Sequence, residues 1–177
     1  MNREILKLAI PNIISNITVP LLGLVDMILM GHLSSSVYIG AIALGGTIFS
    51  VLYSFFSFLR AGTTGFTAQS FGANNTSEIS YSLYRSITIA VLASILIICV
   101  RHPIARLSVV LLDGSNDVEN LAITYFYVRI WAAPANMLLY CFNGWFIGMQ
   151  NTKIPMAIAI IINVLNIDIN ITKNSSE

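Results

Sequence analysis

The feature that most constrains this chain is a series of long apolar runs separated by short polar breaks. The runs cover residues 5–30, 37–71, 82–100, 121–149 and 154–170. A helix that crosses a bilayer needs roughly 20 mostly apolar residues, and it keeps its backbone hydrogen bonds within its own segment. The pattern therefore predicts an all-α membrane protein with about five transmembrane helices in a single transmembrane domain.

The composition agrees with a lipid environment and excludes other classes of protein. Of the 177 residues, 56% are hydrophobic and only 10% are charged, and the mean hydropathy is +0.79. A soluble globular domain carries about 25% charged residues. The formal net charge is +1, which gives no basic surface for a nucleic acid, so the expected partner is the lipid bilayer and no nucleic acid is expected.

The polar breaks suggest where the chain leaves the membrane. Arg101, His102 and Pro103 end the third run, because the charges and the proline both stop a membrane helix. Residues 104–112 are amphipathic and suit the interface. After Asn166 the chain is too polar to complete a span, so the fifth helix is expected to be cut short. With the amino terminus inside, four counted basic residues fall on the cytoplasmic side (Arg3, Lys7, Arg85 and Lys153) and three fall outside (Arg101, Arg106 and Arg129). This small excess favours a cytoplasmic amino terminus in a multi-pass protein of the plasma (inner) membrane.

Polar residues inside the runs identify candidate functional positions, since lipid-facing positions are apolar. Asp26 is the acid within the first four runs, on a face of the first helix that also carries Asn12 and Asn16. A buried carboxylate is neutralised by a proton or a cation, which suggests ion binding. The alternative is that Asp26 reaches the interface and is solvated there. Pro11 leaves a carbonyl without its helical donor, so this helix is expected to bend.

Neutral amides form two further stripes at helical spacing. Asn136, Tyr140, Asn143 and Gln150 share a face of the fourth run. Asn163, Asn166 and Asn170 share a face of the fifth run. With the Asp26 face, they predict one polar cavity enclosed by the first, fourth and fifth helices. For each amide taken singly, a hydrogen bond to a neighbouring helix explains its presence as well.

Other polar or small residues point to packing rather than to chemistry. A ridge of small side chains on the second run predicts a close contact with another helix. Its members are Thr47, Ser50, Ser54, Ser57 and Ala61. Cys99 and Cys141 lie in apolar runs far from any histidine, so we expect packing roles and no metal site. No catalytic or nucleotide-binding motif occurs, so neither an enzyme nor a cofactor is expected.

Several segments, in order, resemble the multidrug and toxic compound extrusion (MATE) transporters, particularly their DinF-like bacterial branch. They are Ala9-Ile10-Pro11, residues 20–26 (PLLGLVD), residues 31–33 (GHL), residues 58–65 (FLRAGTTG), Ala68-Gln69, residues 144–151 (GWFIGMQN) and residues 163–166 (NVLN). The match runs over nearly the whole chain, which makes the resemblance specific.

The resemblance implies an antiporter that exports organic cations and other amphipathic drugs in exchange for H⁺ or Na⁺. Such transporters consist of two six-helix bundles around a central cleft, so this chain resembles most of the first bundle and the carboxy-terminal bundle is missing. By position, Asp26 matches the acid of ion coupling and Pro11 the proline at which the first helix bends. Asn143 and Asn166 match polar residues of the substrate cavity. Many relatives carry a second acid at the position of Asn170.

Two other functional classes stay open. The chain can be a non-transporting membrane module, either truncated or assembled through its ridge of small residues. A lipid-linked oligosaccharide flippase of the wider superfamily is a third reading, and it should carry more basic residues in its cavity.

Overall fold

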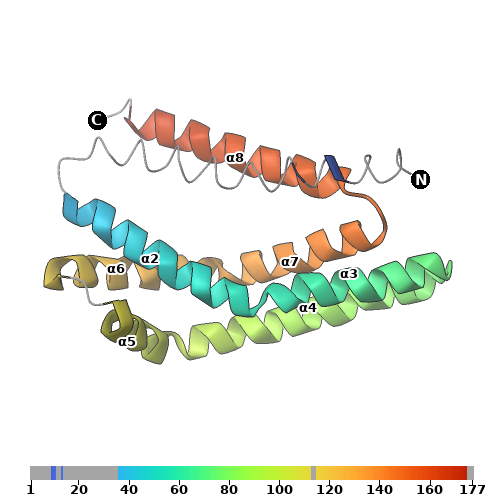
Figure 1. The fold of residues 1–177 in the computed structure, drawn as a ribbon, viewed down its shortest axis with the longest axis horizontal. Coiled ribbons are helices and arrows are strands. Elements are labelled where there is room, and N and C mark those ends of the chain that lie inside the picture. Colours follow the sequence, from blue (N-terminus) through green and yellow to red (C-terminus); the bar gives the residue numbers. More distant parts are fainter. Residues whose placement is uncertain (1–8, 11–12, 14–35, 113–114, 175–177) are drawn as a thin grey trace.

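The computed structural model describes residues 9–10, 13, 36–112 and 115–174, and these ranges are almost entirely helical. The named elements are α2 (Ser36–Phe55), α3 (Ser57–Gly72), α4 (Thr76–Cys99), α5 (Arg101–Leu112), α6 (Asn116–Arg129), the 3-10 helix η1 (Ile130–Ala132), α7 (Ala133–Gly148) and α8 (Lys153–Asn174) (Figure 1). No strand occurs within the described ranges. The predicted all-helical class is confirmed.

Two of the expected spans are each divided in the structure. The run 37–71 forms α2 and α3, which are separated at Phe56 by a tight turn: the Phe56 amide donates to the Tyr53 carbonyl at 3.1 Å. The run 121–149 forms α6, η1 and α7. Pro134 lies in the first turn of α7, where its missing N–H is tolerated and its ring prevents α6 from continuing unbroken.

Helices α4 and α8 extend beyond the apolar runs that predicted them. Helix α4 begins at Thr76, because the side chain of Asn75 caps it by accepting a hydrogen bond from the Glu78 amide at 3.1 Å. Helix α8 continues to Asn174, beyond the predicted end at residue 170, but its apolar part ends at Leu165. The polarity of these residues limits burial in lipid, but it does not prevent helix formation.

Two described stretches are long and apolar enough to cross a membrane. They are Val37–Gly72, with 36 residues, and Thr76–Cys99, with 24 residues. The apolar part of α8 is the shorter stretch Lys153–Leu165. At 1.5 Å per residue, 24 residues span about 36 Å, which exceeds the roughly 30 Å hydrocarbon core.

Most helices form one packed layer, and α8 runs along one side of it (Figure 1). Within the layer α2 packs on α6, and α3, α4 and α7 pack on one another. The α2 and α6 contact is aromatic, with the rings of Phe49 and Phe126 stacked at 5.3 Å. The buried core continues through Ile97, Ile130 and Met137.

The contact of α7 with α3 depends on two glycines four residues apart. A Cβ atom on Gly144 would lie 2.6 Å from the Arg60 carbonyl oxygen, and one on Gly148 would lie 2.6 Å from the Thr67 Cβ. No real Cβ fits at these distances. A glycine pair at this spacing lets two membrane helices approach closely, and the two glycines with the α3 backbone form what we call the glycine seam.

Buried hydroxyl groups join α3 to α4 on the neighbouring side. The Thr63 and Ser86 hydroxyl oxygens lie 2.8 Å apart, and those of Thr67 and Ser82 lie 3.0 Å apart. All four side chains are buried. Such interhelical hydrogen bonds satisfy polar groups that lipid cannot solvate.

The predicted ridge of small residues does not take part in this packing. Thr47, Ser50, Ser54, Ser57 and Ala61 are all exposed, so none of the described helices covers them, and a contact with another helix stays a prediction. Lipid is as apolar as a protein core, so small residues on either face of a helix give the same sequence signal.

The two cysteines differ. Cys141 is fully buried in α7, and its thiol donates to the Ser86 carbonyl at 3.2 Å. Its predicted packing role is confirmed. Cys99 is exposed on α4, so it does not pack in this core.

Candidate functional site

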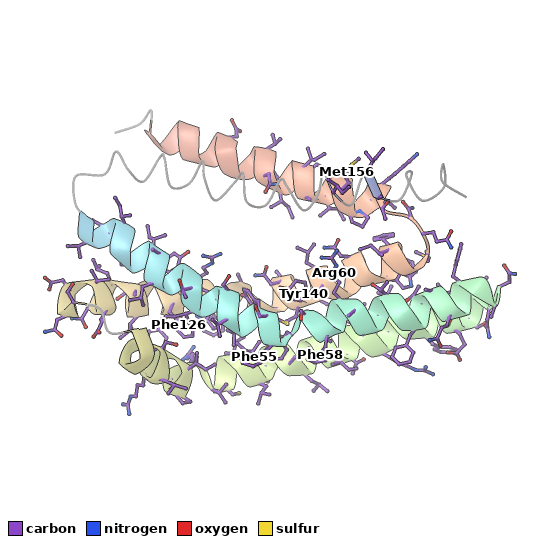
Figure 2. The ribbon with its side chains drawn as sticks, viewed as in Figure 1. Phe55, Phe58, Arg60, Phe126, Tyr140 and Met156 are labelled. Atoms are coloured by element: carbon purple, nitrogen blue, oxygen red, sulfur yellow. The ribbon has the colours of Figure 1, made fainter. Side chains whose placement is uncertain are left out.

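A group of polar and aromatic side chains gathers where α2, α3, α6 and α7 meet. We call it the polar cluster. Its members are Tyr53 on α2, Arg60 on α3, Tyr125 and Arg129 on α6, and Asn136 and Tyr140 on α7. Asn143 follows Tyr140 on the same face of α7 and is counted with them by that position. Arg60 and Tyr140 are close together near the edge of the layer that is nearer to α8 (Figure 2).

Asn136 links α7 to α2. Its amide nitrogen donates to the Tyr53 hydroxyl at 3.2 Å and to the Ala132 carbonyl at 3.1 Å. Tyr140, one turn further along α7, lies within electrostatic range of both Tyr53 and Arg60. The predicted stripe of Asn136 and Tyr140 is therefore part of one connected group of side chains.

Arg129 adds a cation that is supported by aromatic rings. Its guanidinium carbon lies 5.0 Å from the Phe49 ring centre and 5.4 Å from the Tyr125 ring centre. It also donates a hydrogen bond to the Tyr125 hydroxyl. Cation–π contacts of this kind stabilise an arginine where solvation by water is reduced.

Two predicted cavity residues have buried amide atoms without a hydrogen-bond partner in the described structure. They are the Asn143 side-chain oxygen and the Asn163 side-chain nitrogen. Asn163 on α8 is only 7% exposed. An unpaired buried amide costs free energy, so such groups are expected where a ligand, a water molecule or a further chain segment completes them.

The remaining predicted site residues cannot be related to this cluster. Asp26 and Pro11 lie outside the described residues. Asn166 lies on α8, three residues after Asn163, and its side chain is outside the described part. The predicted cavity between the first, fourth and fifth helices therefore stays a prediction. Gln150, at the end of the fourth-run stripe, lies beyond α7 in the turn before α8, with φ of 59°.

The sequence reasoning missed the two arginines and Tyr53. Arg60 and Arg129 are charges next to or within apolar runs, and that position alone was a usable signal, since charged residues in membrane helices mark functional sites. Tyr53 gave no such signal, because an isolated tyrosine in an apolar run is unremarkable in composition. Tyr53 is identified as a member of the cluster only by the hydrogen bond that its hydroxyl accepts from Asn136 of α7.

The cluster is suited to binding rather than to catalysis. Phenol hydroxyls and amides offer both donors and acceptors, the rings offer apolar faces, and the guanidinium groups offer positive charge. No group of three histidine, cysteine, aspartate or glutamate side chains able to hold a metal occurs in the part of the chain that the structure describes.

These features define a class of protein: an all-helical membrane protein with polar and aromatic side chains gathered where its helices meet. Comparison with known families is more specific. A model of the MatE family matches residues 11–172, which is most of the chain. The chain therefore belongs to the MatE family, whose members are membrane transporters and not enzymes.

Individual relatives support this membership. The chain is 40% identical over 166 residues to DNA damage-inducible protein F of Escherichia coli (strain K12). It is 28% identical over 168 residues to the multidrug resistance protein MdtK of Edwardsiella ictaluri, and 26% identical over 167 residues to the multidrug resistance protein NorM of Vibrio cholerae. These alignments cover 94%, 95% and 94% of the chain. The chain spans 36% of the length of each of these relatives.

Proposed function

We propose that this chain supplies helices of a secondary active transporter that exports drugs or organic cations by antiport with H⁺ or Na⁺. The observation that supports it best is the polar cluster, because the Asn143 amide oxygen is buried and has no hydrogen-bond partner among the described residues. Several relatives bear the name multidrug resistance protein. No ATP is needed, because the ion gradient drives such an exchange.

The described side chains suit one part of an amphipathic cargo. Tyr53 and Tyr140 offer rings and hydroxyls, while Asn136 and Asn143 offer amides. The two arginines repel a cation, so a cationic cargo needs a carboxylate from elsewhere. We assign that role to Asp26, with Asn163 and Asn166 as further cavity residues.

The same carboxylate provides the coupling. An ionised Asp26 attracts the cationic cargo, and a proton or Na⁺ on it leaves the arginine charges unopposed, which favours release. Bending of the first helix at Pro11 accompanies this exchange in our proposal. The protein has its amino terminus in the cytoplasm and lies in the plasma (inner) membrane.

Because the chain spans 36% of its relatives' length, the proposal concerns these helices together with a carboxy-terminal bundle. The test joins the chain to the remaining length of the Escherichia coli relative and measures ion-driven efflux of a cationic dye from proteoliposomes. Asp26→Asn should abolish efflux. Glu78→Gln, the same charge change on an exposed residue outside the cluster, should leave efflux intact. Undiminished efflux with Asp26→Asn would refute the coupling role.

A second candidate function is assembly without transport. The exposed ridge from Thr47 to Ala61 favours it, because small side chains on an open helix face permit a close contact with another helix. Cysteine cross-linking at Ser54 in membranes tests this. A defined homo-oligomer of the chain alone, with no dye binding, would favour the assembly role over the transport role.

A further inference from the structure

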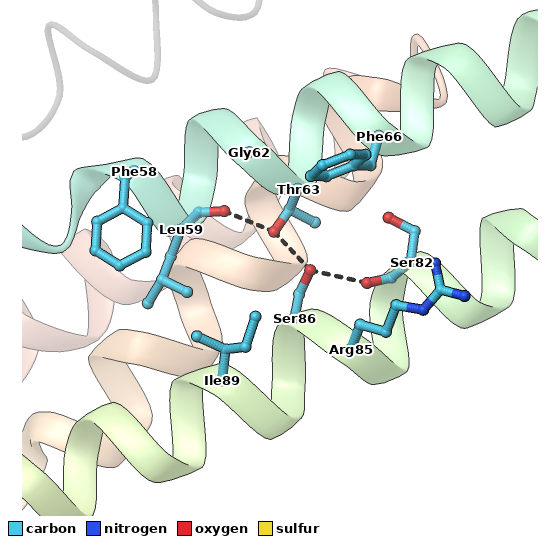
Figure 3. Close-up of a pocket in the computed structure, with 9 residues that line it drawn as sticks. All are labelled: Phe58, Leu59, Gly62, Thr63, Phe66, Ser82, Arg85, Ser86 and Ile89. Atoms are coloured by element: carbon cyan, nitrogen blue, oxygen red, sulfur yellow. Dashed lines mark hydrogen bonds between the residues drawn. The ribbon is translucent and has the colours of Figure 1, made fainter.

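A groove of about 240 Å³ lies between α3 and α4, away from the polar cluster (Figure 3). Phe58 and Phe66 of α3 and Ile89 of α4 form its walls, and Gly62 leaves its floor open. Phe58, Phe66 and Ile89 are 56%, 68% and 49% exposed. The groove therefore opens on the outer surface of the layer.

The hydroxyl groups beneath the groove are already satisfied by the protein. Thr63 donates to the Leu59 carbonyl at 2.6 Å or to the Ser86 hydroxyl at 2.8 Å, and Ser86 donates to the Ser82 carbonyl at 2.8 Å (Figure 3). Their hydrogen bonds point into the helix contact. The groove thus presents a mainly apolar surface, which suits a hydrocarbon chain better than a polar ligand.

Arg85 provides a cation at one end of this apolar surface. Its side chain is 70% exposed, and its guanidinium contacts the Glu78 carboxylate through a single distance of 3.5 Å. Exposed pairs of this kind are weak. The guanidinium group can therefore exchange this partner for a phosphate, which it binds through two parallel hydrogen bonds.

Aromatic residues indicate that Arg85 lies at the membrane interface. Tyr81 and Tyr84 are exposed on the same turn of α4, and the Trp145 indole donates to the Ile79 carbonyl at 2.9 Å. Tyrosine and tryptophan gather at the level of lipid headgroups.

A second aromatic level marks the other side of the membrane. Arg101 lies over the Trp131 ring, 5.4 Å from its centre. From Tyr84 to its end at Cys99, α4 rises about 23 Å along its axis, and Arg101 follows at the start of α5. This separation is close to the thickness of the hydrocarbon core.

The groove runs inward from this interface. Because α3 and α4 are antiparallel, Phe66 faces the turn of Ser82, while Phe58 lies toward Ile89 and the middle of the membrane. A molecule with a phosphate at Arg85 would therefore place a chain between the phenyl rings. A cationic amphipath would be repelled by Arg85 in the same position.

We propose that this groove binds an anionic phospholipid, with its phosphate on Arg85 and one acyl chain between Phe58, Phe66 and Ile89. The site is separate from the polar cluster, so its lipid is not the transported cargo. The proposal concerns lipid binding alone, and it stands even if the transport activity proposed above is disproved.

The experiment compares phosphatidylglycerol with phosphatidylcholine on the purified 177-residue chain in neutral detergent. Native mass spectrometry counts the bound lipids. The chain should retain phosphatidylglycerol about fivefold more strongly, as one interfacial arginine provides. Arg85→Gln should remove this preference, and Arg85→Lys should keep part of it. Arg106→Gln, which removes an exposed arginine from α5, should leave the preference unchanged.

A second pair of variants tests the groove itself. Gly62→Leu fills the floor, where an added Cβ meets nothing within 4 Å, and should reduce the retention of both lipids. Gly65→Leu, on the same helix and equally open, lies outside the groove and should have no effect. Equal retention of the two lipids by the unmodified chain would overturn the proposal. So would an unchanged preference in Arg85→Gln.

Discussion

The two faces of α7 have opposite properties although both are poor in large apolar side chains. One face carries Gly144 and Gly148 against α3, and its backbone lies in direct contact with a neighbouring helix. The other carries Asn136, Tyr140 and Asn143, and its amide groups are only partly hydrogen-bonded. The first face is fully packed against α3, whereas among the described residues the second face leaves the Asn143 amide oxygen without a hydrogen-bond partner. Substitutions on the first face should therefore lower the free energy of unfolding. Substitutions on the second face should lower the proposed transport activity.

The largest loss of stability should follow from a methyl group on the glycine seam. Gly144→Ala forces the new Cβ against the Arg60 carbonyl, which is backbone and cannot rotate away. The helices must separate, at a cost of about 1–3 kcal/mol in the free energy of unfolding. Titration with a denaturing detergent, followed by circular dichroism, measures it.

The matched control is Gly46→Ala on α2, where an added Cβ meets nothing within 4 Å. It should be neutral or stabilising by up to about 1 kcal/mol, because alanine favours the helix. Equal effects of the two changes would mean that α7 does not approach α3 as closely as described.

A smaller loss should follow from removing one hydroxyl between α3 and α4. Thr63→Val keeps the shape of the side chain but removes its hydrogen bond to Ser86. Interhelical hydrogen bonds in membranes contribute about 0.6 kcal/mol on average, so the expected loss lies near that value. The same detergent titration detects it, with Thr88→Val as control, since the Thr88 hydroxyl bonds only within α4 in the described structure.

The polar face of α7 should respond in the opposite sense. Asn143→Leu removes a buried oxygen that has no partner in the described structure, so stability should stay unchanged or rise by up to about 1 kcal/mol. Dye efflux by the chain joined to its carboxy-terminal bundle should fall several-fold. A marked loss of stability instead would show that Asn143 serves packing.

The smallest effect is expected at the Arg85–Glu78 pair, which is exposed and long at 3.5 Å. Glu78→Gln should change the free energy of unfolding by less than about 0.5 kcal/mol. Repeating the titration at high salt serves as a check, because screening should leave no difference between the variant and the original chain.

The sequence predicted the helical class and most helix positions, because apolar runs in a membrane protein have few other solutions. It also identified Asn136, Tyr140 and Asn143 as one stripe. It did not predict the break at Phe56, since neither proline nor glycine occurs among Ser54, Phe55, Phe56 and Ser57. Pro134 was a visible signal for the break before α7.

The buried face of α3 could not be chosen from the sequence. On this helix Thr63 and Thr67 are buried, whereas Ser57 and Ala61 are exposed, yet all four are small residues and each pair has helical spacing. In water the apolar face would have settled the choice. In lipid the hydrophobic effect does not distinguish the two faces, so only the tertiary contacts decide.

The breaks at Phe56 and at η1 have a joint consequence. Because α2 packs on α6 while α3 packs on α7, the layer consists of two groups of helices. The boundary between the groups lies at Phe56 and η1. The Tyr53 to Asn136 hydrogen bond crosses this boundary, from α2 in one group to α7 in the other. A rotation of one group against the other changes that distance, so the Tyr53 to Asn136 hydrogen bond links the angle between the two groups to the shape of the polar cluster.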